Sequence, residues 1–311
     1  MARRARRERD ARPGPSGFLV VDKPSGWTSH DVVDAARRWL GTRRVGHLGT
    51  LDPAATGVLP LAVRDATKLV PFLEAGSKGY VGTIRLGAET DTLDADGDVL
   101  RRHVGPLPDE ACVRAALSRF SGEMAQVPPM FSAVKRNGVR LHKLARAGKH
   151  VERQPKTVRI DRLDLLKYAP PDLDILVECS AGTYVRVIAE DLGRELGCGA
   201  HLAGLRRTRS GPFLEAHAAP EPVLREAAEA GEIDARVVPP VNALQYPVVR
   251  LSAEDVGQVR HGAAVRAPDA SLTPGTRVAA LDPSGELLAV LEVRPGRHLQ
   301  PLRVLSVAAP G

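Results

Sequence analysis

The chain has 311 residues, 43% of them hydrophobic, and a formal net charge of +7 at pH 7, which leaves room for a large core and for more than one domain. No apolar run approaches the roughly 20 residues that span a bilayer, and no apolar stretch follows the arginine-rich start of the chain, so neither a membrane helix nor a secretory signal is expected. The three widely spaced cysteines match neither a disulfide framework nor a zinc pattern, which favours a reducing compartment and a cytoplasmic location.

The positive charge is concentrated in two segments. Residues 1–12 carry six arginines against two acids, and residues 135–159 carry nine lysines or arginines against one glutamate, while the remainder of the chain is net acidic. One strongly basic internal segment in a mildly acidic body is typical of a localised surface for a polyanion. A solvated charged face without a partner is the alternative, because basic runs are common.

The first elements lead to a loop that carries an acid. Residues 18–21 predict a short buried strand, because four apolar residues end at a Pro-Ser-Gly turn. Ser29 is predicted to cap a helix that runs to about residue 40. Residues 46–57, GHLGTLDPAATG, contain three glycines and a proline, which make regular structure costly and predict a shaped loop. Loops on a rigid scaffold often carry catalytic residues, and Asp52 lies in the middle of this one.

The chemistry of this loop is ambiguous on its own. It lacks the Lys-Ser/Thr end of a P-loop and the glycine spacing of a dinucleotide fingerprint, so nucleotide hydrolysis is disfavoured. An Asp-Pro turn is usually structural, because aspartate bends and caps chains well. Three residues that complement a carboxylate acting on a base lie beside other glycines or turns: His47, Tyr80 and Arg186. Each also has a structural interpretation, as a hydrogen-bonding loop residue, a core aromatic or an exposed charge.

The middle of the chain alternates strands and helices. Residues 57–63 predict a strand, residues 65–73 a helix, and residues 78–86 a strand around Tyr80. The acid-rich segment 91–99, DTLDADGDV, is interpreted as a hairpin connection, because its acids do not fall at the alternating positions of a calcium loop. Metal binding there is not expected.

A further helix places an arginine at an unfavourable position. It follows a predicted helix at 109–120 and predicted strands at 157–168 and 173–180. Its predicted cap is Thr183, its predicted stop is Gly197, and its buried stripe is Val185, Ile188, Leu192 and Leu196. Arg186 falls in the first turn, where the positive end of the helix dipole disfavours a cation. We therefore expect Arg186 to pair with an acid elsewhere in the fold, which the sequence alone does not identify.

The last part of the chain has a different pattern. A proline-rich linker, ARVVPPVNALQYP, precedes a compact, mostly β unit. Its predicted elements are a capped helix at 252–262 and strands at 277–282, 286–293 and 302–307. A domain boundary near Pro247 is expected.

Six segments of the chain occur together in one order. They are GFLVVDKPSGWTSHDVV, GHLGTLDPAATGVLPLAV, KGYVGTIRLGAETDTLDADG, VPPMFSAVKRNGVRLHKLARAG, CSAGTYVRVIAEDLG and GCGAHLAGLRRTRSGPF. In these segments the chain resembles the bacterial TruB-type tRNA pseudouridine synthases, over nearly everything after the basic tail. The resemblance implies an α+β fold: a mixed, largely antiparallel central sheet flanked by helices, a basic thumb insertion, and a small C-terminal β-barrel PUA-like domain.

The resemblance also implies an activity. It is the isomerisation of one uridine to pseudouridine in the T-arm loop of tRNA, at the position numbered 55. Asp52 corresponds to the family's catalytic aspartate, which either attacks the ribose C1′ or removes the C2′ proton, and the sequence does not choose between these routes. The base detaches, turns and reattaches through carbon 5 without net consumption of electrons or water, so no cofactor and no metal are expected.

Other site residues carry over from the resemblance by position. Arg186 corresponds to the arginine that pairs with the aspartate, which predicts a lowered pKa for Asp52. Tyr80 corresponds to the tyrosine that stacks on the target base and relays a proton from carbon 5. His47 corresponds to the histidine that fills the place of the base in the T-loop after it flips out. The two further positions that line the family's site are Lys23 and Leu205.

The basic tail at 1–16 lies outside the resemblance and is expected to be disordered. The resemblance implies a catalytic domain at 17–246 and a PUA-like RNA-binding domain at 247–311. Within the catalytic domain, residues 123–156 correspond to a mobile thumb whose basic side chains meet phosphates. The thumb residues assigned to substrate binding are Lys135, Arg136, Arg140, Lys143 and Arg146.

Two other functions fit parts of the sequence. An RNA-binding module without catalysis, such as a tRNA folding chaperone, would use the thumb and the PUA-like unit but would not need Asp52. A synthase that works with guide RNA and partner proteins, as in archaeal and eukaryotic relatives, fits the long basic insertion less well, because a stand-alone enzyme must grip RNA itself. We therefore expect tRNA as the partner, no membrane association, no obligatory protein partner, and a monomer.

Overall fold

The computed structural model describes residues 13–73, 76–132, 134–136, 139–141, 144, 151–268 and 271–305, with the backbone alone at 135–136 and 139–140. Only the last four residues of the predicted tail 1–16 fall within these ranges. Two predicted thumb residues, Lys143 and Arg146, lie outside the described residues. For Lys135, Arg136 and Arg140, the structure describes the backbone but not the side chains.

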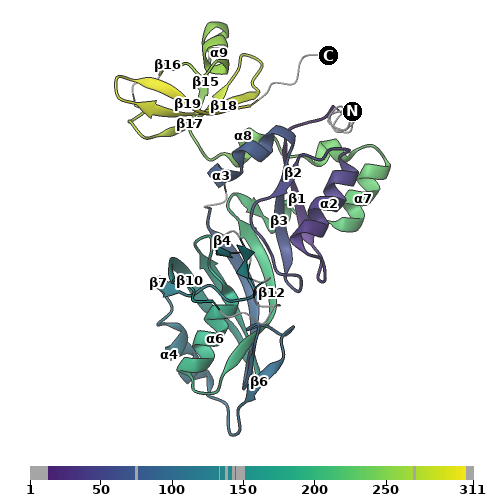
Figure 1. The fold of residues 1–311 in the computed structure, drawn as a ribbon, viewed down its shortest axis with the longest axis vertical. Helices are drawn as coiled ribbons and strands as arrows, with labels where there is room; N and C mark the ends of the chain where they lie inside the picture. The colour runs from purple at the N-terminus through teal and green to yellow at the C-terminus, as the bar shows by residue number, and fades with distance from the viewer. Residues whose placement is uncertain are drawn as a thin grey trace.

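A ten-stranded mixed sheet forms the centre of the molecule (Figure 1). Eight strands follow one another in the order β14 (Ala219–Pro220), β1 (Gly17–Lys23), β3 (Thr56–Val63), β12 (Ala200–Ser210), β4 (Lys78–Leu86), β11 (Asp172–Cys179), β10 (Lys156–Ala169) and β7 (Gly122–Gln126). In addition, β2 (Val45–His47) pairs with β3, and β13 (Phe213–Leu214) pairs with β12. Only the β1–β14 and β3–β12 pairs are parallel, so the predicted α+β fold with a mixed, largely antiparallel sheet is confirmed.

Both faces of the sheet are buried near β1. Leu19 and Val21 belong to one core cluster and Phe18 and Val20 to another, as the two-residue period of a strand requires. Four helices contribute apolar residues to the first cluster and therefore cover one face: α2 (Ser29–Trp39), α4 (Glu110–Leu117), α6 (Val185–Glu195) and α7 (Glu221–Glu229). Figure 1 shows α2 and α7 side by side at the β1 end of the sheet.

Helix α2 begins with a capping box, because its sequence has Thr28 followed three residues later by Asp31. The Asp31 amide donates to the Thr28 hydroxyl at 3.1 Å, and the Thr28 amide donates to the Asp31 carboxylate at 2.8 Å, which satisfies two amides at the helix start. The predicted cap at Ser29 is therefore wrong by one residue. The Ser29 hydroxyl instead bonds the backbone of Leu51 in the glycine-rich loop.

Strand β12 lies between β3 and β4, yet the sequence analysis assigned no strand to it. Its sequence, AHLAGLRRTRS, carries three arginines and a glycine, so its side chains lack the apolar alternation on which strand prediction depends. Pairing on both sides holds β12 in a strand conformation. It pairs antiparallel with β4 along most of its length and parallel with β3 at Arg206 and Arg207.

The shorter elements refine several predictions. The helix expected at 65–73 is a 3₁₀ turn, η1 (Arg64–Leu69), followed by one helical turn, α3 (Val70–Leu73). The predicted hairpin is confirmed by the antiparallel pair β5 (Ala88–Thr90) and β6 (Val99–Arg102). The remaining short elements are β8 (Lys135–Arg136), β9 (Val139–Arg140), η2 (Glu215–His217), η3 (Ile233–Arg236) and α8 (Pro240–Ala243).

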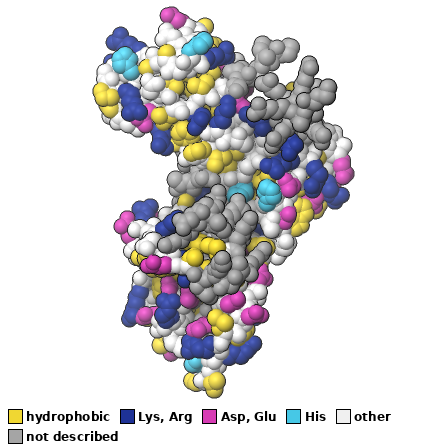
Figure 2. Space-filling model, viewed as in Figure 1, with side chains coloured by type: hydrophobic (Ala, Val, Ile, Leu, Met, Phe, Trp, Pro, Cys, Tyr) yellow, Lys and Arg dark blue, Asp and Glu magenta, His cyan; other side chains and the backbone are white. Residues whose placement is uncertain are grey.

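The C-terminal part forms a separate curled sheet of five strands, half of a barrel. Their order is β15 (Val248–Arg250), β17 (Arg277–Leu281), β18 (Leu287–Arg294), β19 (His298–Val304) and β16 (Val265–Arg266). Helix α9 (Ala253–Arg260), capped by Ser252, packs Val256 and Val259 into this sheet's own core cluster. The predicted β-rich unit is thus confirmed, and Figure 2 shows basic side chains on its surface, all of them arginines.

No helix in the described part of the chain combines the length and the apolar character that crossing a membrane requires.

Candidate active site

The glycine-rich loop is held in one shape by hydrogen bonds to the start of α2. The Ser29 hydroxyl donates to the Leu51 carbonyl at 3.1 Å and accepts from the Leu51 amide at 2.9 Å. The Gly26 amide donates to the Pro53 carbonyl at 2.9 Å. Gly49 adopts φ +124°, a conformation that side-chain-bearing residues rarely take. These contacts fix Asp52 at the tip of the turn, with 46% of its side chain exposed.

Lys23 holds the same loop from behind. Its ammonium group donates to the carbonyls of Pro24, Trp27 and Pro53 at 2.9, 2.5 and 2.9 Å. The side chain is fully buried and is not among the residues that line the cavity beside Asp52, so it lies behind the loop rather than in the lining of that cavity. Burial is the main reason why the pKa of Lys23 falls to about 8, and the nearby Asp52 carboxylate opposes that fall.

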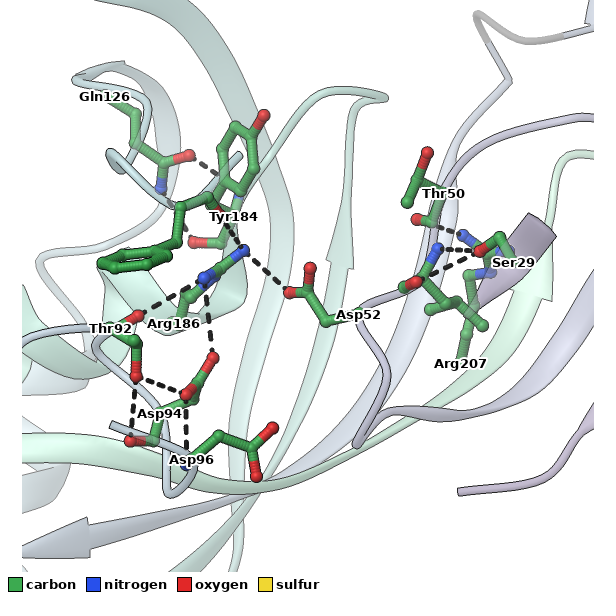
Figure 3. Close-up of polar contacts among 12 residues, drawn as sticks. Ser29, Thr50, Asp52, Thr92, Asp94, Asp96, Gln126, Tyr184, Arg186 and Arg207 are labelled. Atoms are coloured by element: carbon green, nitrogen blue, oxygen red, sulfur yellow. Dashed lines mark hydrogen bonds and ion pairs between the residues drawn. The ribbon is translucent and has the colours of Figure 1, made fainter. Parts of the chain in front are cut away.

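Arg186 reaches Asp52 from the first turn of α6. Its Nη2 lies 2.9 Å from Asp52 Oδ2, and the arginine side chain is only 4% exposed. The same nitrogen donates to the Phe131 carbonyl at 2.9 Å, and Nη1 donates to the Thr92 carbonyl at 3.3 Å. Figure 3 shows the two side chains pointing toward each other from the loop and the helix. The expectation that Arg186 pairs with an acid is confirmed, and the acid is Asp52.

A second carboxylate, Asp94, lies on the other side of the guanidinium (Figure 3). Its Oδ2 is 3.5 Å from Arg186 Nη1, and its Oδ1 accepts from the Thr92 hydroxyl at 2.5 Å and from the Asp96 amide at 3.2 Å. The connection that carries Asp94 is tied to β12, because Leu202 exchanges backbone hydrogen bonds of 3.0 Å with Leu93 and Ala95. Sequence reasoning missed Asp94, although the acid-rich turn was its visible signal.

The start of α6 is set by an amide side chain rather than by a hydroxyl cap. The Gln126 side chain accepts from the Tyr184 amide at 2.7 Å and donates to the Tyr184 carbonyl at 3.1 Å. Helix α6 has Tyr184 at its N-cap, and the Thr183 hydroxyl bonds back to the Ser180 carbonyl at 2.9 Å. The predicted cap at Thr183 is therefore wrong, because a long-range partner on β7 replaces it.

Burial and charge act in opposite directions on Asp52. The surrounding protein removes water from the carboxyl group and raises its pKa above the ordinary value, and the negative charge of Asp94 adds to that rise. The Arg186 guanidinium lowers the pKa but does not cancel the effect of burial. The predicted lowering of the Asp52 pKa is therefore wrong in direction.

Asp52 and Arg186 open onto a cavity of about 300 Å³, at the lower end of the size range for small-ligand sites. Tyr80, from β4, and Leu205, from β12, line this cavity. His47 is not among the lining residues. It ends β2, and its Nδ1 accepts from the Gly49 amide at 3.3 Å, so it lies beside the loop rather than in the cavity.

Arg207 is a cavity residue that sequence reasoning missed. Its side chain is 1% exposed and donates to the carbonyls of Val58, Gly49 and Thr50 at 2.7, 3.2 and 3.4 Å. Burial lowers the pKa of Arg207 and raises that of Tyr80, and the contact between the two side chains opposes both shifts.

Among the described residues, no three or more His, Cys, Asp or Glu side chains are grouped so as to hold a metal ion. The chemistry that the described side chains offer is therefore that of one half-exposed carboxylate, one buried guanidinium and one phenol around a small cavity. Such a site can attack a carbon or remove a proton, and it can stabilise negative charge that develops on a ligand.

Comparison with protein families gives three consecutive matches. Residues 37–185 match "TruB family pseudouridylate synthase (N terminal domain)", residues 186–244 match "tRNA pseudouridylate synthase B C-terminal domain", and residues 246–306 match "tRNA Pseudouridine synthase II, C terminal".

Curated relatives match over nearly their whole length. The chain is 44% identical over 295 residues to tRNA pseudouridine synthase B of Pseudomonas paraeruginosa, covering 93% of this chain and 96% of that protein. It is 46% identical over 310 residues to the protein of the same name from Burkholderia mallei, covering 97% and 98%.

Solved structures share the fold at lower identity. A Cbf5–Nop10–Gar1 complex contains a chain that is 29% identical, with a TM-score of 0.70, covering 93% of this chain and 84% of the other. An H/ACA RNP bound to a substrate RNA containing 2′-deoxyuridine gives 27% identity and a TM-score of 0.71, covering 93% and 85%.

Proposed function

The chain belongs to the TruB family of pseudouridylate synthases and is an isomerase that acts on tRNA, and from that premise we propose that it converts one uridine of the T-arm loop, at position 55, to pseudouridine. The observation that carries the proposal is the ion pair between Asp52 and Arg186 at the wall of the 300 Å³ cavity. A uridine inside a folded loop must be flipped out to reach such a cavity, at a cost of a few kcal/mol.

Asp52 is the proposed catalytic carboxylate. In one route its oxygen bonds to the ribose C1′ while the C1′–N1 bond breaks. In the other it takes the C2′ proton, and a C1′–C2′ double bond forms as the base leaves. In both routes the electron pair of the C1′–N1 bond stays on the uracil, which turns and bonds to C1′ through carbon 5. As that bond forms, the bond from Asp52 to C1′ breaks in the first route, and C2′ takes its proton back from Asp52 in the second. Carbon 5 then loses its proton and N1 gains one, so no further reactant is consumed.

The neighbouring residues have distinct proposed roles. Arg186 holds the carboxylate of Asp52 in its charged form and fixes its direction. Tyr80 packs against the uracil and relays the proton of carbon 5. Leu205 forms an apolar part of the cavity wall. Lys23 stiffens the loop from behind instead of touching the substrate. His47 lies outside the cavity, which is consistent with contact to the tRNA loop from which the base has left.

The rest of the chain is proposed to bind the RNA. Residues 17–246 form the catalytic domain, whose basic segment within 123–156 meets phosphates, and residues 247–311 form an RNA-binding domain. Exposed arginines of the C-terminal sheet support this role: Arg250, Arg266, Arg277, Arg294 and Arg303. We propose that the chain acts as a monomer in the cytoplasm, without guide RNA or a protein partner.

The experiment that tests this function uses the purified chain and an unmodified T-arm stem-loop as its only RNA. We expect pseudouridine at the position equivalent to 55, detected by mass mapping of the product. A non-catalytic RNA-binding module would bind the stem-loop and leave it unmodified. A guide-dependent synthase would also leave it unmodified until a guide RNA and partner proteins are added. A second reaction that contains these additions therefore separates the two alternatives.

A further inference from the structure

The lining of the cavity carries more positive than negative charge. Among the described residues that form it, Asp52 is the only acid, and the cations are Lys78, Arg186 and Arg207. Arg186 pairs with Asp52, and none of the steps described above uses the other two cations. Their side chains are 5% and 1% exposed. A lining with this excess of positive charge favours a negatively charged group in the cavity.

Lys78 is directed by the pairing of β4 with β12. It begins β4, two residues before Tyr80, so the two side chains lie on the same face of the sheet. Ser210 is its cross-strand partner on β12, and the Lys78 ammonium group donates to the Ser210 hydroxyl at 3.0 Å. Both side chains are buried, so this hydrogen bond is shielded from water and fixes where the ammonium group lies.

The two cations meet beside Gly49. A Cβ built on Gly49 would have Arg207 Nη1 at 3.8 Å and Lys78 Nζ at 4.0 Å. The two nitrogen atoms are therefore at most about 8 Å apart, the sum of these distances. No other described residue outside the chain neighbours of Gly49 comes closer to that position, so one atom of methyl or oxygen size fits there in ordinary contact. We call this position, bordered by Gly49, Lys78 and Arg207, the cationic corner.

Arg207 fixes the cationic corner to the loop that carries Asp52. Its Nη2 donates to the Gly49 carbonyl at 3.2 Å, and its Nη1 donates to the Thr50 carbonyl at 3.4 Å. These acceptors are neutral, and the effects on the pKa of Arg207 come from burial and from Tyr80, with no acid among them. The charge of this guanidinium therefore acts on whatever group enters the corner.

The detached uracil is the negative group that the cationic corner can receive. The phosphates stay on the RNA backbone outside the cavity, whereas the flipped base enters it. When the C1′–N1 bond breaks, the electron pair stays on the uracil, and its charge spreads to O2 and O4. Cations that are in place before this charge forms stabilise it without any rearrangement.

We propose that Lys78 is a further catalytic residue: its ammonium group holds a carbonyl oxygen of the uracil in the cationic corner and, with Arg207, stabilises the charge on the detached base. This inference rests on the proposed function and deepens it. Lys78 keeps its proton throughout, and the charge on the base disappears when carbon 5 bonds to C1′. As the uracil turns about the axis through N3 and C6, carbon 5 takes the place of N1, and O4 takes the place of O2. The corner therefore holds an oxygen before and after the turn.

The test compares two bases that differ in how readily they leave as anions. Fluorine at carbon 5 withdraws electrons and itself stabilises the uracil anion, so a stem-loop with 5-fluorouridine at the target position depends less on an external cation. Lys78→Met removes the charge from the corner. We expect its single-turnover rate to fall about 100-fold with uridine but about 20-fold or less with 5-fluorouridine. Consumption of the target nucleoside, measured by chromatography of RNA digests, gives both rates.

A purely structural role of Lys78 would slow both substrates by the same factor, because a distorted cavity does not distinguish them. Equal losses, or wild-type rates with both substrates, overturn the inference. The matched control is Lys167→Met, because Lys167 is an exposed lysine on β10. This control should leave both rates and their ratio unchanged.

A second variant covers the case in which Lys78→Met does not fold. In Lys78→Gln the side chain can still donate to the Ser210 hydroxyl but carries no charge. We expect the rate with uridine to fall about tenfold or more, with a smaller loss for 5-fluorouridine, while the tRNA dissociation constant changes less than about threefold. A wild-type rate with uridine in Lys78→Gln overturns the inference.

Failure of this inference can be distinguished from failure of the proposed function. A wild-type chain that forms no pseudouridine contradicts the function. A wild-type chain that is active, but whose Lys78→Met variant loses the same factor with both substrates, contradicts only the role of Lys78.

Discussion

At the residue scale, the balance of burial and charge on Asp52 predicts how the activity depends on pH. Both routes need Asp52 ionised, and its pKa lies above the ordinary value, so the rate should rise with pH as the carboxyl group loses its proton. Arg186→Gln removes the cation that holds this pKa down, so the acid limb of the profile should move to higher pH. Single-turnover rates between about pH 4 and 8 measure it. A limb at the same or lower pH would show that Arg186 does not stabilise the charged form.

Asp94 gives a second prediction at this scale, because it holds Arg186 from the side opposite Asp52. Asp94→Asn should reduce turnover by about tenfold, since a misplaced guanidinium no longer orients the carboxylate, while tRNA affinity should change little. Rapid-mixing assays with saturating enzyme and a filter-binding titration separate the two effects. Asp98→Asn is the matched control, because that side chain lies on the same turn and is exposed. If Asp94→Asn weakened binding and left turnover intact, Asp94 would be an RNA contact.

The residues of the site were only partly predictable. An arginine in a first helical turn requires an acidic partner, which is why the pairing of Arg186 could be anticipated from the sequence. Asp94 and Arg207 could not, because their partners lie far away in sequence and become neighbours only when β12 enters the sheet. The position of Lys23 behind the loop could not be anticipated for a related reason, because its three carbonyl partners come together only in the folded turn.

At the element scale, the approach of β3 to β12 depends on Gly57. A Cβ built on Gly57 would lie 2.2 Å from the Arg207 carbonyl oxygen, and the residue has φ +98°. Gly57→Ala should therefore lower the free energy of unfolding by about 2 to 5 kcal/mol, from backbone strain and overpacking together. Denaturant titration measures this loss. Gly46→Ala is the control, because nothing lies within 4 Å of its Cβ, and equal stability of the two variants would contradict the packing argument.

Helices and strands whose own sequence carries a cap or a clear apolar pattern were predicted from the sequence, and those without such a pattern were not. Helix α9 has a capping box and β18 a continuous apolar run, and both could be anticipated. The short 3₁₀ turn η1 and the arginine-rich β12 could not, because tertiary pairing and packing override weak propensities there.

At the scale of the whole molecule, the concentration of positive charge in residues 135–159 predicts how tRNA binding depends on salt concentration. Neutralising Lys135, Arg136, Arg140, Lys143 and Arg146 together should weaken tRNA binding and make its salt dependence shallower, by about one in slope for each lost phosphate contact. Affinities between about 50 and 200 mM salt measure this slope. The matched control neutralises five exposed arginines outside that segment: Arg38, Arg101, Arg102, Arg114 and Arg119. A salt slope equal to that of the wild type in the first variant would place the RNA surface elsewhere.

The most direct test of the account is the Asp52→Asn variant of the full chain with unmodified tRNA. The substitution keeps the shape of a side chain held beside Arg186 but removes the charge that both chemical routes require. The account predicts that tRNA binding stays within about threefold of the wild type while pseudouridine formation falls below detection, a loss of about 10⁴-fold or more. Pseudouridine formed at a rate near that of the wild type would contradict it.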